Sequence, residues 1–214
     1  MNNYTEEQSA YINYKGDADT KLLACAGSGK TRCIIARIDR LIKDKIYDNS
    51  EVLMLTFSRL TRDDFMKKIT SYDAKYVDKS IVKTIDSFSK SLIDKDNNID
   101  VSLLSFKFMK YLEETPIKEI KENDKLNKLK CVFVDEAQDL NKTQYNIFVH
   151  LKKKLGVKIN LVGDPNQNIY QFRGSSDKYL RKFEGEVFKL TKNFRSKESV
   201  VSFSKYLRPM GIQM

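Results

Sequence analysis

The stretch LLACAGSGKTRC, residues 22–33, decides the fold that the rest of the chain is expected to adopt. An apolar run there ends in a loop of small residues, and the loop closes with Gly29, Lys30 and Thr31. A phosphate-binding loop has the pattern glycine, four residues, then Gly-Lys-Ser/Thr, and Ala24 stands here in the first position. The stretch is therefore either a nucleotide site with one altered position or a tight turn between a strand and a helix.

The context of this loop favours the nucleotide site. The apolar run 21–26 predicts a strand before it, and the amphipathic segment 30–43 predicts a helix after it. Backbone N–H groups of such a loop, together with the N-terminus of the helix, hold anionic oxygens. Lys30 would then reach the terminal phosphates, and Thr31 would offer its hydroxyl to Mg²⁺. The other loop residues expected to bind phosphate are Ala26, Gly27, Ser28 and Gly29.

Strand-like runs and helix-like segments alternate along the chain. Strands are predicted over residues 21–26, 51–57, 80–85, 130–135, 158–164 and 186–190. Helices are predicted over residues 30–43, 59–69, 87–93, 103–114 and 141–155. Several strand-like runs are continuously apolar, which indicates burial on both faces of a parallel sheet. We therefore expect an α/β domain with a mainly parallel sheet and helices on both faces. The charged stretch 113–130 is expected to be a surface connection or a short exposed helix.

An acidic pair follows the run CVFVDEAQDL, residues 131–140. Asp135 and Glu136 come at the end of a buried strand, and ligands of open α/β sheets bind at that edge. Phosphoryl transfer to water needs one carboxylate that holds Mg²⁺ (Asp135) and one that orients or deprotonates the water (Glu136). The alternative is a solvated acidic loop without a ligand.

A third segment, LVGDPNQNIYQFRGS (161–175), again places a loop after a strand. Gln167 is a neutral donor that could sense a γ-phosphate. Tyr170, Phe172 and Arg173 form a set of two aromatic rings and a cation that suits stacking on bases. As isolated residues, the two aromatic side chains would more often belong to a core.

Basic residues are in excess, with 39 Lys and Arg against 29 Asp and Glu and a formal charge of +10. The excess suits a polyanion partner such as nucleic acid, but a lysine-rich coding bias would give the same charge. Arg195, in KLTKNFRS (189–196), is either a clamp on a γ-phosphate or an ordinary surface arginine.

The composition also bears on location. Cys25, Cys33 and Cys131 have no CxxC spacing and lie in or beside apolar runs, which is typical of buried thiols in a reducing compartment. The N-terminus lacks a signal pattern, and no apolar run approaches the ~20 residues of a membrane helix. We expect a soluble, intracellular protein.

Seven ordered motifs resemble those of UvrD/Rep-type superfamily 1 DNA helicases. They are TEEQSAYI, ACAGSGKTR, VLMLTFSRLTRDDF, VKTIDSFSKSLI, VFVDEAQDL, LVGDPNQNIYQFRGS and LTKNFRS, and the match runs from about Gln8 to Ser196. The resemblance implies a RecA-like P-loop NTPase fold. Alanine in the first phosphate-loop position is common in that family, so the opening stretch is identified as a nucleotide site.

The resemblance also implies a role for each matched residue. Gln8 would read the adenine edge, and Arg32 would lie against the adenine ring. Glu136 would be the catalytic base, and Thr31 and Asp135 would hold Mg²⁺. The residues implied in catalysis are Lys30, Asp135, Glu136, Gln167 and Arg195. The residues implied along single-stranded DNA are Thr56, Phe57, Ser87, Tyr170, Phe172 and Arg173.

Three departures from the family pattern stand out. The family usually has Trp where Phe172 stands, and it often has His where Asp86 stands. The segment at about 89–130 has room for a few helices, whereas the family typically inserts an accessory domain there. The chain also stops at Met214, soon after the last motif. We therefore expect residues 1–190 to form a first motor domain and residues 191–214 to begin a second, truncated one.

The function implied is that of an ATP-dependent DNA helicase, with ATP and Mg²⁺ as cofactors and single-stranded DNA as partner. A second motor domain or a partner chain would supply the missing half, and no membrane is involved. The alternative is a nucleic-acid-binding switch that uses ATP without translocating.

Overall fold

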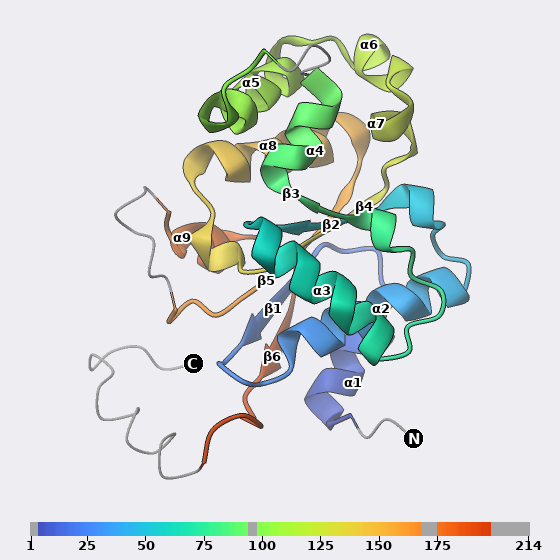
Figure 1. The fold of residues 1–214 in the computed structure, drawn as a ribbon, viewed down its shortest axis with the longest axis vertical. Coiled ribbons are helices and arrows are strands. Elements are labelled where there is room, and N and C mark those ends of the chain that lie inside the picture. Colours follow the sequence, from blue (N-terminus) through green and yellow to red (C-terminus); the bar gives the residue numbers. More distant parts are fainter. Residues whose placement is uncertain (1–3, 94–97, 168–174, 198–214) are drawn as a thin grey trace.

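An all-parallel sheet of six strands forms the centre of the computed structural model, which describes residues 4–93, 98–167 and 175–197 (Figure 1). The order across the sheet is β3-β2-β4-β5-β1-β6, and neighbouring strands are parallel throughout. The strands are β1 (Thr20–Ala24), β2 (Val52–Thr56), β3 (Val82–Thr84), β4 (Cys131–Val134), β5 (Lys158–Gly163) and β6 (Glu186–Leu190). All six predicted strands are present, and the predicted α/β class is confirmed.

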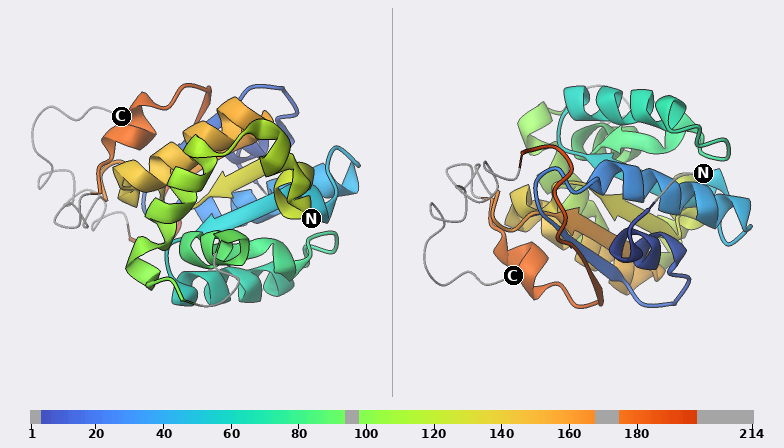
Figure 2. Two further views of the ribbon diagram at one scale, coloured as in Figure 1. Left: turned by 90° about the horizontal axis from the view of Figure 1, so that it is seen from above. Right: turned by 90° about the horizontal axis from the view of Figure 1, so that it is seen from below.

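Helices cover both faces of this sheet (Figures 1 and 2). They are α1 (Glu6–Asn13), α2 (Lys30–Lys43), α3 (Arg59–Ser71), α4 (Ile85–Ile93), α5 (Val101–Glu114), α6 (Ile117–Glu122), α7 (Asp124–Lys128), α8 (Lys142–Leu155) and α9 (Lys178–Lys182). One core contains side chains from α1, α2 and α3. The other core contains side chains from α4 to α9.

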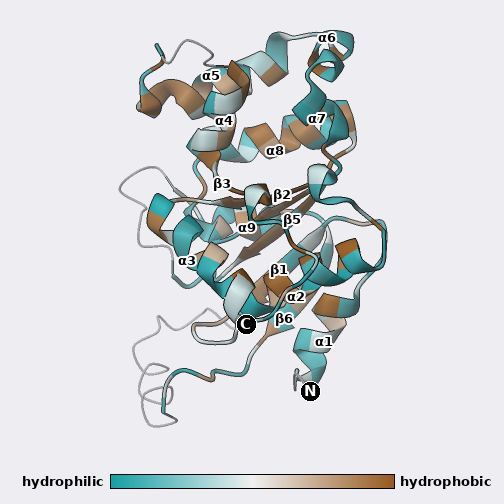
Figure 3. Ribbon diagram, turned by 45° about the vertical axis from the view of Figure 1, so that its right-hand side comes forward, coloured by the Kyte–Doolittle hydropathy of each residue, from teal (hydrophilic) through white to brown (hydrophobic). Residues whose placement is uncertain are grey.

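The strand β4 shows why the predicted strands read as continuous apolar runs. Cys131 and Phe133 belong to the core under α2 and α3, whereas Val132 and Val134 belong to the core under α8. Successive side chains of a strand point to opposite faces, so a sheet covered on both sides needs apolar residues at every position. Figure 3 shows the strands as brown, apolar ribbon between helices with hydrophilic outer residues.

The stretch between α5 and β4, predicted as a surface connection or a short exposed helix at 113–130, is largely exposed but is anchored by a few buried side chains. The short helices α6 and α7 occupy it, and Ile120 and Leu126 are fully buried in the core shared with α4, α5 and α8. A helix of one or two turns needs only one inward apolar side chain, so the charged composition hid the packing. The segment expected to replace an accessory domain, at about 89–130, thus packs on the core of the sheet itself.

Two helices, α1 and α9, have no counterpart among the helices predicted from the sequence. α1 begins with a capping box, in which the Thr5 hydroxyl accepts a hydrogen bond from the Gln8 N–H at 3.2 Å and Gln8 Oε1 accepts one from the Thr5 N–H at 3.1 Å. Thr-x-x-Gln before an apolar residue is a recognised sign of a helix start. α1 packs beside α2 and β6 and thereby covers one face of the sheet at its edge strand, β6.

The expected division of the chain at about residue 190 stays a prediction, because residues 198–214 lie outside the described residues. The described segment 191–197 follows β6 and lies against the loop after β1. Within the part of the chain that the structure describes, no helix is both long and apolar enough to cross a membrane.

Candidate nucleotide site

Four loops meet at the carboxyl edge of the sheet, because β1 lies between β5 and β6, and β5 lies beside β4. The loops are residues 25–29 after β1, 135–141 after β4, 164–167 after β5 and 191–197 after β6. Ligands of open parallel sheets bind at this edge. The fold therefore brings together nucleotide-site candidates that are distant in sequence.

The loop after β1 has the backbone that a phosphate-binding loop requires. Gly27 and Gly29 have φ of +70° and +86°, values that glycine adopts without a steric cost. Gly29 precedes α2 without a side-chain cap, so the first N–H groups of the helix remain for an anion. Ala24 is not among the described residues with positive φ, so its position does not require glycine.

Lys30 is held by a carboxylate across the site. Its Nζ lies 2.8 Å from Oε2 of Glu136, and the lysine side chain is only 12% exposed. Burial by itself would lower the pKa of Lys30, but the negative charges of Glu136 and Asp135 outweigh burial and raise it. Burial would raise the pKa of Glu136, but Lys30 outweighs burial and the pKa is lowered. Both groups are therefore charged near neutral pH.

Asp135 is a buried carboxylate whose Oδ1 accepts a hydrogen bond from the N–H of Glu136 at 2.9 Å. Burial, followed by the negative charge of Glu136, raises the pKa of Asp135 to about 6. A cation beside it would stabilise the ionised form. Mg²⁺ takes oxygen ligands, often one or two carboxylates completed by substrate phosphates. Asp135 and the Thr31 hydroxyl form a donor set of this kind, so the residues present fit Mg²⁺ bound together with a nucleotide.

Gln138 is a site residue that the sequence analysis does not single out. Its Nε2 donates to Oε2 of Glu136 at 2.9 Å, and its Oε1 accepts from the N–H of Asp164 at 3.0 Å. Asp164 in turn accepts from Nε2 of Gln167 at 2.7 Å. The expected base and the expected γ-phosphate sensor are thus connected through hydrogen bonds. This connection depends on β4 and β5 being neighbours, which no local spacing reveals.

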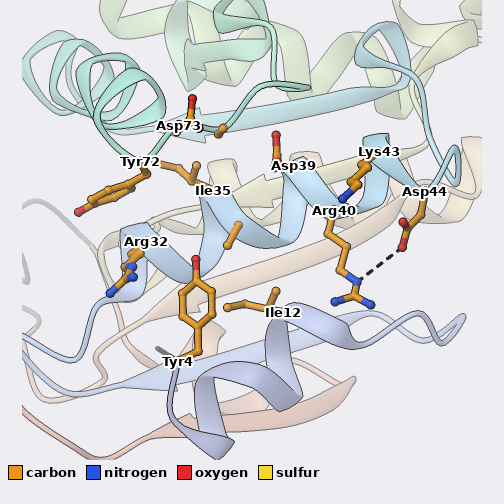
Figure 4. A pocket seen from close by; sticks show the side chains of 12 residues that line it. Tyr4, Ile12, Arg32, Ile35, Asp39, Arg40, Lys43, Asp44, Tyr72 and Asp73 are labelled. Atoms are coloured by element: carbon orange, nitrogen blue, oxygen red, sulfur yellow. Dashed lines mark ion pairs between the residues drawn. The ribbon is translucent and has the colours of Figure 1, made fainter. Parts of the chain in front are cut away.

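The adenine candidates lie at the end of the phosphate loop beside α1. Gln8 is 4% exposed, and its Nε2 donates to the carbonyl of Ser28 at 3.0 Å. The guanidinium of Arg32 lies over the ring of Tyr4, 4.7 Å from its centroid. Tyr4 and Arg32 line a pocket of about 340 Å³ that extends along α2 toward the end of α3 (Figure 4). Gln8 therefore joins α1 to the phosphate loop, and its reading of adenine stays a prediction.

The loop after β6 lies directly on the phosphate loop. The N–H of Phe194 donates to the carbonyl of Gly27 at 2.9 Å. Asn193 Oδ1 accepts hydrogen bonds from the N–H groups of Arg195 and Ser196, each at 2.8 Å. A Cβ on Gly27 would lie 2.7 Å from Cβ of Arg195. Gly27 therefore has to be glycine for its close approach as well as for its φ.

A carboxylate holds the start of this loop, and an arginine near its end carries a charge that acts on the site. The carboxylate of Glu7 on α1 accepts from the N–H and the hydroxyl of Thr191, each at 2.8 Å. Burial raises the pKa of Glu136 and Lys30 lowers it, and the exposed Arg195 lowers it further. The charge of Arg195 therefore acts on the same carboxylate that binds Lys30.

The residues expected along single-stranded DNA differ in exposure. Thr56 is fully buried, and its hydroxyl donates to the carbonyl of Ser58 at 3.3 Å. The DNA contact implied for Thr56 stays a prediction, and its buried side chain presents no surface for that contact in this structure. Phe57 is half-buried and packs against the core under α8. Ser87 is exposed at the start of α4.

Asp86, which departs from the family pattern, has a partner inside the protein. Its Oδ1 accepts a hydrogen bond from the hydroxyl of Ser105 on α5 at 2.9 Å. The residue thus joins α4 to the segment that is reduced here. The remaining DNA candidates lie outside the described residues and are Tyr170, Phe172 and Arg173.

The chain is similar to known helicases in sequence. A family model described as the UvrD/REP helicase N-terminal domain matches residues 4–98 and 90–187. A protein of Acanthamoeba polyphaga mimivirus, named as a putative ATP-dependent DNA helicase, is 41% identical over 217 residues, which cover 99% of this chain and 31% of that protein. DNA helicase II of Haemophilus influenzae is 36% identical over 80 residues, which cover 36% of this chain and 11% of that protein.

The fold has a counterpart among solved structures. The crystal structure of Pif1 helicase from Candida albicans matches with a TM-score of 0.64 at 16% identity, over 97% of this chain and 44% of that chain. At this identity the likeness concerns the fold alone. The chain spans about a third or less of the length of the two relatives named above.

Proposed function

The chain belongs to the UvrD/REP helicase N-terminal domain family, and we propose that it is the ATP-binding motor domain of a UvrD/Rep-type DNA helicase. The family of ATP-dependent helicases implies the use of ATP. In the proposed function the domain binds ATP with Mg²⁺ and single-stranded DNA, and hydrolysis drives movement along DNA or unwinding. A second motor domain or a partner chain closes the nucleotide cleft, and the protein acts in the compartment that holds the DNA.

The observation that carries the proposal is the ion pair between Lys30 and Glu136, 2.8 Å long. It lies where α2 begins, next to a loop whose two positive-φ glycines turn N–H groups toward an anion. A cation and a carboxylate in one place serve the two ends of phosphoryl transfer to water, phosphate charge and water activation.

Hydrolysis follows from a change of partner at Lys30. A nucleotide phosphate carries more negative charge than one carboxylate, so Lys30 turns to the phosphate and releases Glu136. The free carboxylate then accepts a proton from the attacking water or orients that water in line with the bond that breaks. Gln167 and Arg195 donate to the γ-phosphate in this proposal. Their hydrogen-bonded loops, after β5 and β6, border the same edge.

Mg²⁺ would be held by the Thr31 hydroxyl and Asp135 and would neutralise charge on the phosphates. The raised pKa of Asp135, caused first by burial and then by Glu136, supports this assignment, because a carboxylate in that state gains most from a cation.

Single-stranded DNA would lie over the carboxyl ends of β2 and β3. Phe57 supplies a stacking face there and Ser87 a polar contact, with Tyr170, Phe172 and Arg173 from the loop after β5. Stacking tolerates any base because every base has a π-face, so we propose binding without sequence preference.

Nucleotide binding and turnover test the proposal when they are measured separately. A fluorescent ATP analogue is titrated into wild type, Lys30→Ala, Glu136→Gln and the control Lys118→Ala, which removes an exposed lysine on α6. We expect Lys30→Ala to lose binding, and Glu136→Gln to bind while phosphate release in the presence of single-stranded DNA falls by orders of magnitude.

Equal binding by wild type and Lys30→Ala would contradict the nucleotide site. Binding by wild type with no turnover at any DNA concentration would leave the nucleotide-dependent switch instead of the motor. Strand displacement on a 3′-tailed duplex, measured with the second motor domain or the partner chain present, separates the two functions, because only the motor unwinds.

A further inference from the structure

We propose that Gln138 is a positioning residue that holds the Glu136 carboxylate and the loop after β5 in one fixed arrangement. The proposed base, Glu136, and the proposed γ-phosphate sensor, Gln167, would then change position together when a nucleotide binds. The inference rests on the proposed function, in which Glu136 acts on the attacking water. It assigns to Gln138 a role between two elements, carried by its two amide atoms.

The orientation of the Gln138 amide follows from its surroundings. The N–H of Asp164 points at one end of the amide and is a donor, so that end has to be the oxygen, and the two atoms are 3.0 Å apart. The nitrogen then faces Oε2 of Glu136 at 2.9 Å. The reverse assignment would oppose two donors at Asp164 and two acceptors at Glu136. The hydrogen bonds are therefore specific to glutamine.

The Gln138 hydrogen bond also orients the carboxylate. Lys30 and Gln138 both donate to the same oxygen, Oε2 of Glu136. With both donors on Oε2, Oε1 is the oxygen that remains for the attacking water in the proposed function. Among the described residues that donate to Glu136 from a side chain, Gln138 alone remains when a phosphate takes Lys30. Gln138 is then the side chain that keeps the Glu136 carboxylate oriented toward the attacking water.

Close packing keeps Gln138 in this position. Its side chain is 2% exposed, and it lies against Gly163 at the end of β5. A Cβ on Gly163 would overlap Oε1 of Gln138 and would lie 2.9 Å from Cδ2 of Leu180. The Gln138 amide thus occupies the space that Gly163 leaves open, next to β5 and α9.

The loop after β5 is tied to the same amide through Asp164. Oδ1 of Asp164 accepts from the N–H of Asn166 at 3.0 Å, and Oδ2 accepts from Nε2 of Gln167 at 2.7 Å. A shift of the Gln138 amide therefore reaches Gln167 through two successive hydrogen bonds. Hydrogen bonds of this kind hold a catalytic group in the orientation that the reaction needs. A misplacement of that group by about 1 Å can lower the rate about 10²-fold.

Steady-state ATP hydrolysis with single-stranded DNA present tests the role, in the complete chain. Gln138→Leu removes both hydrogen bonds at nearly constant volume. Gln138→Glu keeps an acceptor for Asp164 but cannot donate to Glu136 as a carboxylate. The control Gln144→Leu makes the same chemical change in the capping box of α8, away from the carboxylates. Thermal unfolding of each variant reports on folding.

We expect kcat to fall about 10²-fold in Gln138→Leu and Gln138→Glu, with KM and the affinity for an ATP analogue within about threefold of wild type. Gln144→Leu should lower the unfolding temperature while kcat stays at the wild-type value. A wild-type kcat in Gln138→Leu would overturn the inference, and so would a KM rise that matches the kcat loss, because that pattern means a merely structural role. Absence of hydrolysis in wild type would overturn the proposed function and this inference with it.

Discussion

Asn193 lies so close to Gly27 that a Cβ on the glycine would come within 2.8 Å of its Oδ1. The loop after β6 thus lies directly against the phosphate loop after β1. Gly27→Ala would place a methyl group in that contact at a φ of +70°. We expect the substitution to lower the free energy of unfolding by about 1 kcal/mol from the backbone and by about 1–3 kcal/mol more from overpacking.

Gly156→Ala is the matched control for that measurement, because Gly156 has the same φ of +70° and nothing within 4 Å of its Cβ position. It should show only the backbone cost. Chemical denaturation of both variants gives the difference. Equal destabilisation would mean that the loop after β6 moves away freely, and would contradict the close contact.

Asp135 should make stability depend on pH in an unusual direction. Its folded pKa, raised to about 6 by burial and then by Glu136, lies above the unfolded value, so the folded state binds the proton more tightly. Protonated Asp135 therefore favours folding, and this contribution is lost as the pH rises from about 4 to about 6. Asp135→Asn should exceed wild type in stability at pH 7.5, by on the order of 1–3 kcal/mol, with the difference vanishing near pH 4.

Asp17 is the control for this pH series, because its pKa is shifted in the opposite direction. Lys158 holds the pKa of the exposed Asp17 below its usual value, by a hydrogen bond and by its charge, so ionised Asp17 favours folding. Asp17→Asn should therefore be slightly less stable than wild type at pH 7.5. ATP with Mg²⁺ should narrow the gap between Asp135→Asn and wild type, because a cation stabilises the carboxylate. A gap that ATP with Mg²⁺ leaves unchanged would argue against Asp135 as the metal ligand.

Phe57→Ala should weaken single-strand binding by about 1–3 kcal/mol if the ring stacks on a base. The slope of log affinity against log salt should stay nearly constant, since that slope counts phosphate contacts from Lys and Arg. Fluorescence anisotropy with labelled oligonucleotides at several salt concentrations measures both quantities. Phe106→Ala, at a 47% exposed aromatic residue on α5, is the control. Unchanged affinity in folded Phe57→Ala would make this ring a core residue only.

Gln8→Ala should reduce the preference for ATP over GTP and should also loosen α1. The side chain caps α1 and donates to the carbonyl of Ser28, so its loss has a stability part as well as a recognition part. Gln144→Ala removes the equivalent residue from the capping box of α8, where no ligand is proposed. Both variants should lose about 1 kcal/mol of stability. Nucleotide selectivity should change in Gln8→Ala alone, and identical selectivity in the two would remove the adenine role.

Most strands could be predicted from sequence because they are short runs buried on both faces, as β4 shows, whereas β6 at the edge of the sheet is largely exposed. The order of the strands could not, because pairs such as β1 with β5 join residues about 140 positions apart and leave no local pattern. α1 could be predicted from its capping pattern of Thr5 and Gln8. The burial of Ile120 and Leu126 could not be predicted, because α6 and α7 are too short, with one or two apolar residues each, to show a helical period.

The residues of the candidate site also divide into those that the sequence predicts and those that depend on the order of the strands. Lys30, Asp135 and Glu136 follow strands in motifs whose chemistry is readable residue by residue. Gln138 acquires its partners only when β4 and β5 become neighbours. The burial of Thr56 was hidden for a similar reason, since a threonine at the end of a strand can face solvent or the loop that follows it.

The position of β1 in the sheet has a consequence for biogenesis. Thr20 pairs with Asn160 on one side and Glu186 on the other, so the first strand of the described sheet pairs with the two strands of that sheet that are synthesised last. Pairing across such distances carries the entropy of closing long loops and is slow. A nascent chain shorter than about 158 residues would contain the glycines and the lysine but neither flanking strand, and one shorter than about 186 residues would still lack β6. We therefore expect the ability to bind a nucleotide to arise abruptly near the end of translation of this domain, and not to grow with chain length.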